Sequence, residues 1–185
     1  MSESRSMVRL TFAMAVASWV AVGAAVWGVQ AQREDAQAQR QDARELLHAQ
    51  IGAELDKQFD STEMRKARKA FAKELLKHPG QLPNEDRVLS FFDKVGTYLR
   101  LGRIDDDTTY SSFSYYAERY WAAAKPSIGA IRKQENDPGY YGDFETLNGK
   151  MLKDDAEDRH RSITDVTPSR AKVDEFLKEE AVLNP

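Results

Sequence analysis

Twenty consecutive residues without a charged side chain, 10–29, constrain this chain more than any other feature. At about 1.5 Å per residue, a helix of this length is about 30 Å long, which matches the hydrocarbon core of a bilayer. The run therefore predicts a transmembrane helix whose partner is membrane lipid, with residues 1–9 as its flank. A signal peptide cleaved after Ala31 is the alternative, but its apolar part usually has only about 7–15 residues.

Two further features of the run concern its behaviour in a membrane. Arg5 and Arg9 precede it, and Arg33, Arg40 and Arg44 follow it, so the positive-inside rule leaves the orientation open. Alanine recurs at every fourth position, which allows close approach between helices in lipid and makes a homo-oligomer one expected partner. An alanine-rich span without such contacts is the alternative. An unidentified second protein is the other expected partner.

The rest of the chain shows helical patterns only. Residues 30–44 are rich in Gln, Ala and alternating charges and contain no Gly or Pro, which predicts a helical stalk. Apolar residues then recur at helical spacing, and no alternating pattern predicts a strand. We therefore predict an all-α fold with a single N-terminal transmembrane helix and a stalk. A small four- to five-helix bundle follows over 45–152, then a polar linker over 153–167 and a C-terminal helix over 168–185.

Local signals predict where several helices begin. Asp60 and Glu63 are spaced as a capping box for the helix that follows. Asp106 or Asp107 is expected to cap the longest helix. Thr167 followed by a proline is typical of an N-cap and the first helical position.

Glycine and proline add further expectations. A helix is expected over 83–101, with Gly102 as its stop. Gly96 falls inside that helix and indicates a close crossing with another element. Pro126 is expected to kink or divide the longest helix at Lys125.

Aromatic residues are concentrated between 110 and 144. Their helical spacing favours a packed core, because buried aromatic rings dominate the energetics of protein interiors. A ligand pocket is the alternative, since Tyr and Trp combine an apolar ring with a polar group. Arg119 is expected to stack on a ring or to pair with a nearby carboxylate. The residues that would form the pocket are Arg119, Tyr120, Trp121, Tyr141 and Asp143.

Basic residues crowd the segment 61–78, where six Lys and Arg residues face only two acidic ones. A solvated helix face is the ordinary interpretation of such charges. The functional interpretation is contact with anionic lipid or with a protein partner. The acidic residues near 154–158 are a further possible acceptor. The expected contact residues are Arg65, Lys66, Lys69 and Lys73.

Composition excludes several classes of function. The chain contains no cysteine, which rules out disulfides, thiolate nucleophiles and cysteine-bound metals. Its net charge of −3 is not that of a nucleic-acid-binding protein, so no nucleic-acid partner is expected. His48, His78 and His160 are scattered, and no zinc or phosphate-binding motif occurs. We therefore expect no catalytic residue, no metal and no cofactor.

An ordered series of short motifs resembles a bacterial family of membrane-anchored domains of unknown function. The resemblance covers about 45–152 and implies a helical fold with one N-terminal span in a bacterial inner (plasma) membrane. In that family a basic segment often follows the span, which favours a cytoplasmic domain. It implies no activity and no functional residue. The motifs are Phe59-Asp60-Ser61-Thr62-Glu63-Met64 with Arg68, Phe91-Phe92 with Val95-Gly96, Gly102-Arg103-Ile104-Asp105, Phe113 with Arg119-Tyr120-Trp121, and Tyr140-Tyr141-Gly142-Asp143-Phe144-Glu145.

These observations together predict a non-enzymatic scaffold or interaction module, held at a membrane by one span. The alternative is a sensor of a small molecule or an anionic lipid with an aromatic-lined pocket. A hydrolase that uses carboxylates alone is the third and weakest hypothesis, because the sequence shows no acid–base pair.

Overall fold

The computed structural model describes residues 37–82 and 86–184, in a chain that divides into two units, 1–46 and 47–185. In the first unit, residues 37–46 are helical and exposed to solvent, which agrees with the helix predicted there. Within the described residues, no helix is both long enough and apolar enough to cross a membrane. The run predicted to span the membrane, 10–29, lies outside the described residues.

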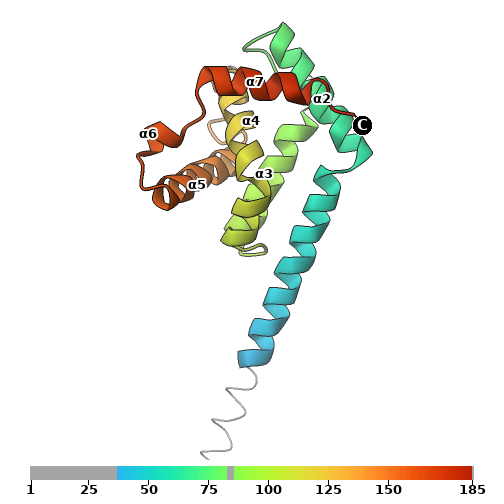
Figure 1. Ribbon diagram of the computed structural model, residues 1–185, viewed down its shortest axis with the longest axis vertical. Helices are drawn as coiled ribbons and strands as arrows, with labels where there is room; N and C mark the ends of the chain where they lie inside the picture. Colours follow the sequence, from blue (N-terminus) through green and yellow to red (C-terminus); the bar gives the residue numbers. More distant parts are fainter. Residues whose placement is uncertain (1–36, 83–85, 185) are drawn as a thin grey trace, which may run out of the picture. The chain divides into compact units, whose positions relative to one another are not determined.

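Helices are the only regular elements in the described part of the second unit, which confirms the predicted all-α class (Figure 1). Residues 47–59 are helical and bury Leu55 and Phe59. The helices that follow are α2 (Thr62–Lys77), α3 (Arg87–Arg100), α4 (Asp106–Gln134), α5 (Gly142–Asp158), α6 (Ile163–Val166) and α7 (Arg170–Glu180).

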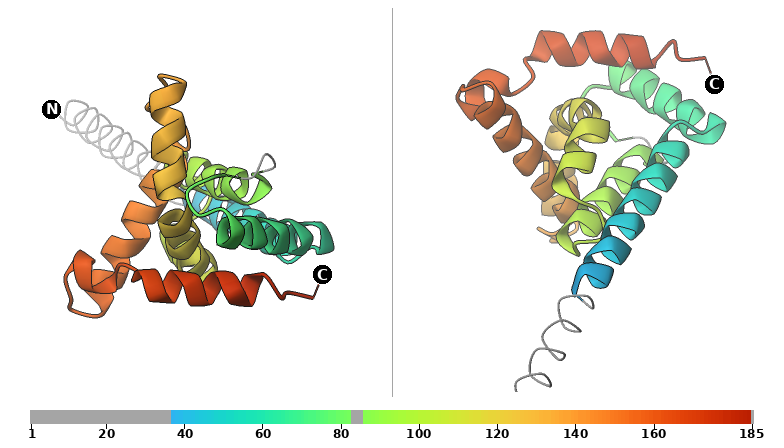
Figure 2. Two further views of the ribbon diagram at one scale, coloured as in Figure 1. Left: turned by 90° about the horizontal axis from the view of Figure 1, so that it is seen from above. Right: turned by 60° about the horizontal axis from the view of Figure 1, so that its bottom comes forward.

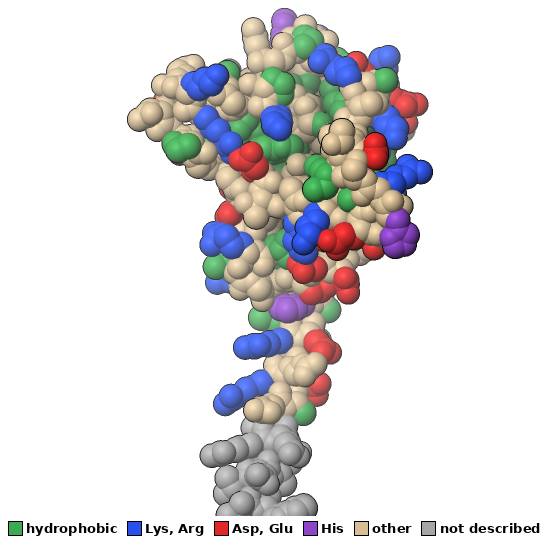
Figure 3. Space-filling model, turned by 90° about the vertical axis from the view of Figure 1, so that its left-hand side faces the viewer, with side chains coloured by type: hydrophobic (Ala, Val, Ile, Leu, Met, Phe, Trp, Pro, Cys, Tyr) green, Lys and Arg blue, Asp and Glu red, His purple; other side chains and the backbone are tan. Residues whose placement is uncertain are grey.

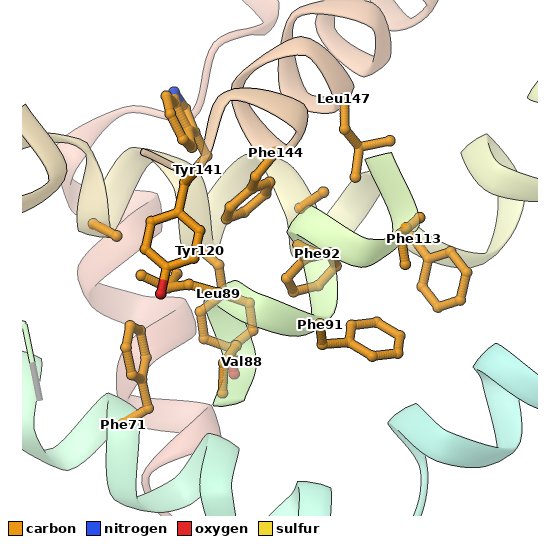
Figure 4. Close-up of a cluster of buried hydrophobic side chains, with 14 of the residues drawn as sticks. Phe71, Val88, Leu89, Phe91, Phe92, Phe113, Tyr120, Tyr141, Phe144 and Leu147 are labelled. Carbon is orange, nitrogen blue, oxygen red and sulfur yellow. The ribbon is translucent and has the colours of Figure 1, made fainter. Parts of the chain in front are cut away.

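The helices pack around one apolar core. α5 packs against both α3 and α4, while α7 lies across α2 and α4 (Figure 2). Figure 4 shows aromatic side chains from α2, α3, α4 and α5 meeting in the interior. The ring of Phe92 stacks on that of Phe144 with centroids 5.1 Å apart, and both residues are fully buried. The core interpretation of the aromatic residues is therefore confirmed.

The predicted close crossing at Gly96 is present. A β-carbon on Gly96 would lie only 2.2 Å from the backbone oxygen of Asp143, which belongs to the first turn of α5. Any side chain at this position would therefore push α3 and α5 apart. Next to the crossing, the Thr97 hydroxyl donates to the Asp143 carboxylate of α5 at 2.6 Å.

Two predicted helix starts are displaced by one or two residues. Ser61, not Asp60, caps α2, because its hydroxyl accepts a hydrogen bond from the backbone nitrogen of Met64 at 3.2 Å. Ser169 caps α7 in the same way, so the predicted cap at Thr167 is wrong. In each case another residue with a capping side chain lies within two positions of the true cap.

Other predicted boundaries also differ from the structure. Asp105 caps α4 by accepting from the backbone nitrogen of Thr108 at 2.7 Å, and the predicted caps Asp106 and Asp107 lie inside the helix. α3 begins at Arg87, later than the predicted helix over 83–101. Gly102 follows its end with φ +61°, as predicted for a helix stop.

Pro126 does not divide α4, which continues from Asp106 to Gln134. Proline removes one backbone donor, but Ala124 and Ile128 on either side of it are fully buried. Their packing holds both halves of the helix in the same core and outweighs the lost hydrogen bond.

The segment predicted as a polar linker, 153–167, is largely helical. α5 continues to Asp158, and Asp155 and Ala156 in its last two turns are buried. α6 occupies a further turn of the same segment. The prediction failed because many charged residues in sequence resemble a solvated linker, whereas α5 buries one face and exposes the other.

Candidate functional site

The basic residues predicted on α2 share a helix but not an environment. Lys66 and Lys73 are exposed, and no hydrogen bond or ion pair holds them among the described residues. The Arg65 guanidinium lies 3.8 Å from the carboxylate of Asp60 in an exposed pair. The Lys69 ammonium donates a hydrogen bond to the backbone oxygen of Leu183 at 2.8 Å. Lys66 and Lys73 of the predicted contact face are therefore free to bind a partner, whereas Arg65 and Lys69 already contact other residues of the chain.

Arg68 of the same basic segment is buried and binds a carboxylate from α7. Its Nε donates to Oε2 of Glu180 at 2.8 Å, and its Nη2 donates to Oε1 at 2.6 Å. The Tyr120 hydroxyl of α4 donates to the same Oε2 atom. A two-pronged arginine contact fixes the orientation of a carboxylate as well as its position. We call Arg68 and Tyr120 the carboxylate site.

Aromatic rings hold the carboxylate site in place. The carbon at the centre of the Arg68 guanidinium lies 4.1 Å from the ring centroid of Phe59 and 4.8 Å from that of Tyr116. Burial by itself lowers the pKa of Arg68, but the hydrogen bond to Glu180 and the electrostatic interactions with Tyr120 and Glu180 together outweigh it, so that pKa lies above its ordinary value. Burial, together with the nearby negative charge of Glu180, raises the pKa of Tyr120. Arg68 therefore stays charged, and Tyr120 stays a donor.

α7 reaches the carboxylate site through one apolar face. Val173, Phe176, Leu177 and Glu180 are its buried residues, spaced as successive positions on one side of a helix. The Phe176 ring meets that of Tyr120 edge-on with centroids 4.9 Å apart. The predicted C-terminal helix therefore packs on the bundle, with a negative charge at the C-terminal end of its buried face.

None of the five residues predicted to line a pocket lines the three main hollows of the described residues. Tyr120 belongs to the carboxylate site, and the Trp121 ring packs against that of Phe144 at 5.1 Å. The Arg119 guanidinium lies 3.6 Å from the centroid of the Tyr115 ring and donates to the backbone oxygen of Tyr115 at 2.8 Å. The expected stacking of Arg119 on a ring is thus present.

The other two residues of the predicted pocket connect α3 to α5. Nε and Nη2 of Arg100 donate to the Asp143 carboxylate at 2.8 and 2.9 Å, and Thr97 donates to it at 2.6 Å. The hydrogen bond from Arg100 is the main cause that lowers the pKa of Asp143. Tyr141 adopts a left-handed backbone conformation with φ +55°, and its hydroxyl donates to the carboxylate of Asp86 at the start of α3.

A second buried polar cluster joins α4 to α5. The Asp155 carboxylate accepts hydrogen bonds from the Tyr110 hydroxyl at 2.9 Å and from Nε of Arg159 at 2.8 Å. Glu118 is 6 % exposed, and no hydrogen bond or ion pair holds its carboxylate among the described residues. Burial, together with the charge of Asp155, raises the pKa of Glu118 to about 7. Its proton can therefore exchange near neutral pH.

A groove of about 460 Å³ lies beside α7, between the end of α2 and the middle of α4. None of the five predicted pocket residues lines it. No aromatic residue lines it, and its charged lining residues are Arg170, Asp174 and Lys178, of which Arg170 pairs with Asp174 at 3.2 Å. The apolar and proline residues that line it are Leu75, Leu76, Pro79, Ala122, Ala123, Pro126, Pro168, Val173 and Leu177.

Acidic side chains surround a smaller hollow of about 250 Å³ between the start of α4 and the end of α5. Lys150 lies among them and pairs with Asp106 at 3.0 Å and Asp154 at 3.4 Å. Figure 3 shows a face of the molecule where Asp and Glu side chains gather around Lys or Arg. The described residues contain no group of side chains that could hold a metal ion.

Sequence reasoning did not find the partners of Arg68. One signal was present, because Arg68 falls in register with the apolar residues Met64, Phe71 and Leu75 of α2. An arginine in such a stripe is buried only with a partner, which directs the search to a distant acidic residue. Glu180 shares its face with Phe176 in the same manner.

Comparison with known families gives one match. The family model described as "Domain of unknown function (DUF4760)" matches residues 15–151. The matched range contains α2, α3, α4 and most of α5, and it ends before α6 and α7. No curated protein and no solved structure matches the chain.

Proposed function

This chain belongs to the DUF4760 family of domains of unknown function, and on that premise we propose that it is a single-span, membrane-anchored interaction module without enzymatic activity. The membrane part of the proposal rests on the charge-free run 10–29, which has the length of a bilayer-spanning helix. The family match begins at residue 15, so the matched range includes most of this run together with the helical domain. That inclusion favours an anchor over a cleaved signal peptide.

One observation carries the interaction part of the proposal. The face formed by α2 and α4 already binds a helix, α7, that lies outside the residues matched to the family. It does so with an apolar contact around Phe176 and a charged one at Glu180. A buried apolar side chain next to a charge held in a fixed orientation is typical of surfaces that recognise helices. The family domain thus carries a helix-binding face.

A second candidate function is the sensing of anionic lipid. Two observations favour it: the free ammonium groups of Lys66 and Lys73 on α2, and the largely apolar groove in which Lys178 supplies a cation while Arg170 is paired with Asp174. Cations next to apolar surface suit an anionic headgroup with an acyl chain. Arg65 and Lys69 complete the proposed contact face.

Extraction of membranes tests the anchor. The full chain should stay with bacterial membranes after washing with alkaline carbonate, and a variant that lacks residues 1–31 should be released. Intact mass of the membrane-bound chain separates the two alternatives, because cleavage after Ala31 leaves a product that begins at Gln32. Recovery of the full-length chain in the carbonate wash would disprove the anchor.

Orientation follows from a second measurement. The proposal places the domain in the cytoplasm of a bacterial cell, as the family resemblance implies. Because the chain has no cysteine, Asp158→Cys introduces a single thiol on an exposed site. A membrane-impermeant maleimide should label it only after the cells are permeabilised. Labelling in intact cells would place the domain on the opposite side.

A further inference from the structure

We infer that the helix-binding face of α2 and α4 accepts the α7 helix of a second copy of this chain in place of the chain's own α7. This exchange would join two copies through swapped C-terminal helices. The inference rests on the proposed function, an interaction module, and deepens it by naming the partner and the surface. The carboxylate site supplies the charged part of the contact.

The carboxylate site is built for one kind of ligand. The guanidinium of Arg68 packs against the neighbouring rings of Phe59 and Tyr116, which help to orient it for a two-pronged contact. Glu180 is the only hydrogen-bond partner that the described residues give to Arg68 and to the Tyr120 hydroxyl. A buried guanidinium without a carboxylate is strongly unfavourable. The site therefore has to be filled, and its chemistry demands an acidic side chain.

The α7 segment carries everything that the site recognises. Val173, Phe176, Leu177 and Glu180 lie on one face, and the backbone oxygen of Leu183 accepts from Lys69. Ser169 caps the helix from within the same segment. An α7 from a second copy would therefore make the same contacts, without any change in the receiving face.

The connection to α5 lets α7 leave its own domain. Eleven residues, 159–169, separate the end of α5 from the start of α7. None of them is buried, and α6 within this stretch buries no residue either. In extended form they reach about 36 Å, enough to carry α7 to a neighbouring molecule. Exchange breaks the contacts of α7, which the second copy restores, and full extension of the connection also unwinds α6 and releases its packing on α5.

Crosslinking between two single-cysteine chains tests the exchange. One full-length chain carries Lys69→Cys and the other carries Leu183→Cys, which places the two thiols across the contact between α2 and the end of α7. The two chains bear different affinity tags, are expressed in the same cells and are purified in detergent. A short bismaleimide should give a covalent heterodimer, because only a swapped α7 brings the two thiols together.

The matched control replaces Leu183→Cys by Glu175→Cys, on the exposed face of α7. The heterodimer should be lost in this control, because that position faces away from α2. A chain that carries both Lys69→Cys and Leu183→Cys reports docking within one molecule. If this double variant crosslinks internally while the mixed chains give no heterodimer, the exchange is disproved. The result of the carbonate extraction is independent of this outcome, so the two proposals fail separately.

Discussion

Arg68 on α2 and Glu180 on α7 form a two-pronged ion pair although 112 residues separate them in sequence. Their side chains are only 4 % and 5 % exposed. Each charge is tolerated in the interior because the other is present. The pair therefore makes the docking of α7 depend strongly on both residues.

Removal of one partner of this pair should destabilise the protein markedly. Arg68→Met leaves the Glu180 carboxylate buried without its cation, and we expect a loss of about 3–5 kcal/mol in the free energy of unfolding. Guanidinium denaturation followed by circular dichroism measures this loss. Arg170→Met is the control, because it breaks only the exposed pair with Asp174, and it should cost less than about 1 kcal/mol.

The double variant Arg68→Met, Glu180→Leu makes the prediction more specific. Because it removes both charges, it should recover much of the stability that Arg68→Met loses. Arg68→Met and Glu180→Leu are also measured separately. If the double variant loses as much stability as the two single variants together, the side chains are not coupled and the ion pair does not hold α7.

Gly96→Ala should destabilise the crossing of α3 and α5. The new methyl group would meet backbone atoms of Asp143, which cannot rotate away, so we expect a loss of about 1–3 kcal/mol or more. Gly149→Ala in α5 is the matched control, because no atom lies within 4 Å of its added β-carbon. Alanine suits a helix better than glycine, so this control should be neutral or stabilising by up to about 1 kcal/mol. Equal effects of both substitutions on the melting temperature would argue against the close crossing.

Glu118 should make stability fall as the pH rises towards neutrality. Its pKa is about 7 in the folded protein and near its ordinary value of 4.5 in the unfolded chain. Between these values the folded state binds more protons than the unfolded state, so increasing pH favours unfolding. Above pH 7 the buried Glu118 carboxylate is charged, and the full free-energy cost of burying that charge lowers the stability. Glu118→Gln should therefore stabilise the protein at pH 8 by about 1–2 kcal/mol, since solvent near the carboxylate screens part of the effect.

Denaturation curves at pH 5 and pH 8 measure this effect. Glu118→Gln should lose less stability than the parent between the two pH values. Glu175→Gln, on an exposed face of α7, should behave like the parent. A parent and a Glu118→Gln variant with the same pH dependence would show that this carboxyl does not titrate in that range.

Reversal of two charges on α2 tests the lipid contact. Lys66→Glu with Lys73→Glu should weaken binding of the chain without residues 1–31 to phosphatidylglycerol vesicles, because each cation contributes about 1 kcal/mol near an anionic surface. Lys133→Glu with Lys153→Glu makes the same change of net charge on α4 and α5 and should have a smaller effect. Vesicle cosedimentation at low and high salt measures both. Binding that is unaffected by salt and by phosphatidylcholine in place of phosphatidylglycerol would contradict a lipid-binding face.

Most of the fold could be predicted because local spacing determines which side of each helix is apolar. Val88, Phe92 and Val95 of α3 recur at helical intervals, and all three are buried. The close crossing at Gly96 could be predicted for the same reason, because a glycine on the buried face of a helix usually marks the close approach of another element. Helix starts were less certain, because Asp60 and Ser61 are both good caps and only the fold selects between them.

The candidate site was harder to predict, because its partners are distant in the sequence. Arg68 falls in register with the apolar residues Met64 and Phe71, which indicates burial, but no local pattern identifies the partner that its charge requires. Glu180 and Tyr120 come to it through the packing of α7 and α4, which no local pattern determines. The predicted pocket failed for a different reason. Tyr141 and Asp143 are close to each other in sequence, but each contacts a different residue of the α3 region instead of lining one common cavity.

The crossing at Gly96 divides the domain into a part that can rearrange and a part that cannot. Where two backbones touch, no alternative rotamer can absorb a displacement, so α3 and α5 move only as one block. The hold on α7 depends instead on the side chains of Arg68, Tyr120 and Phe176, which can separate and meet again without bending a helix. Among residues 47–82 and 86–184, backbone contact thus fixes α3 against α5, whereas side-chain contacts alone attach α7 to the rest of the domain.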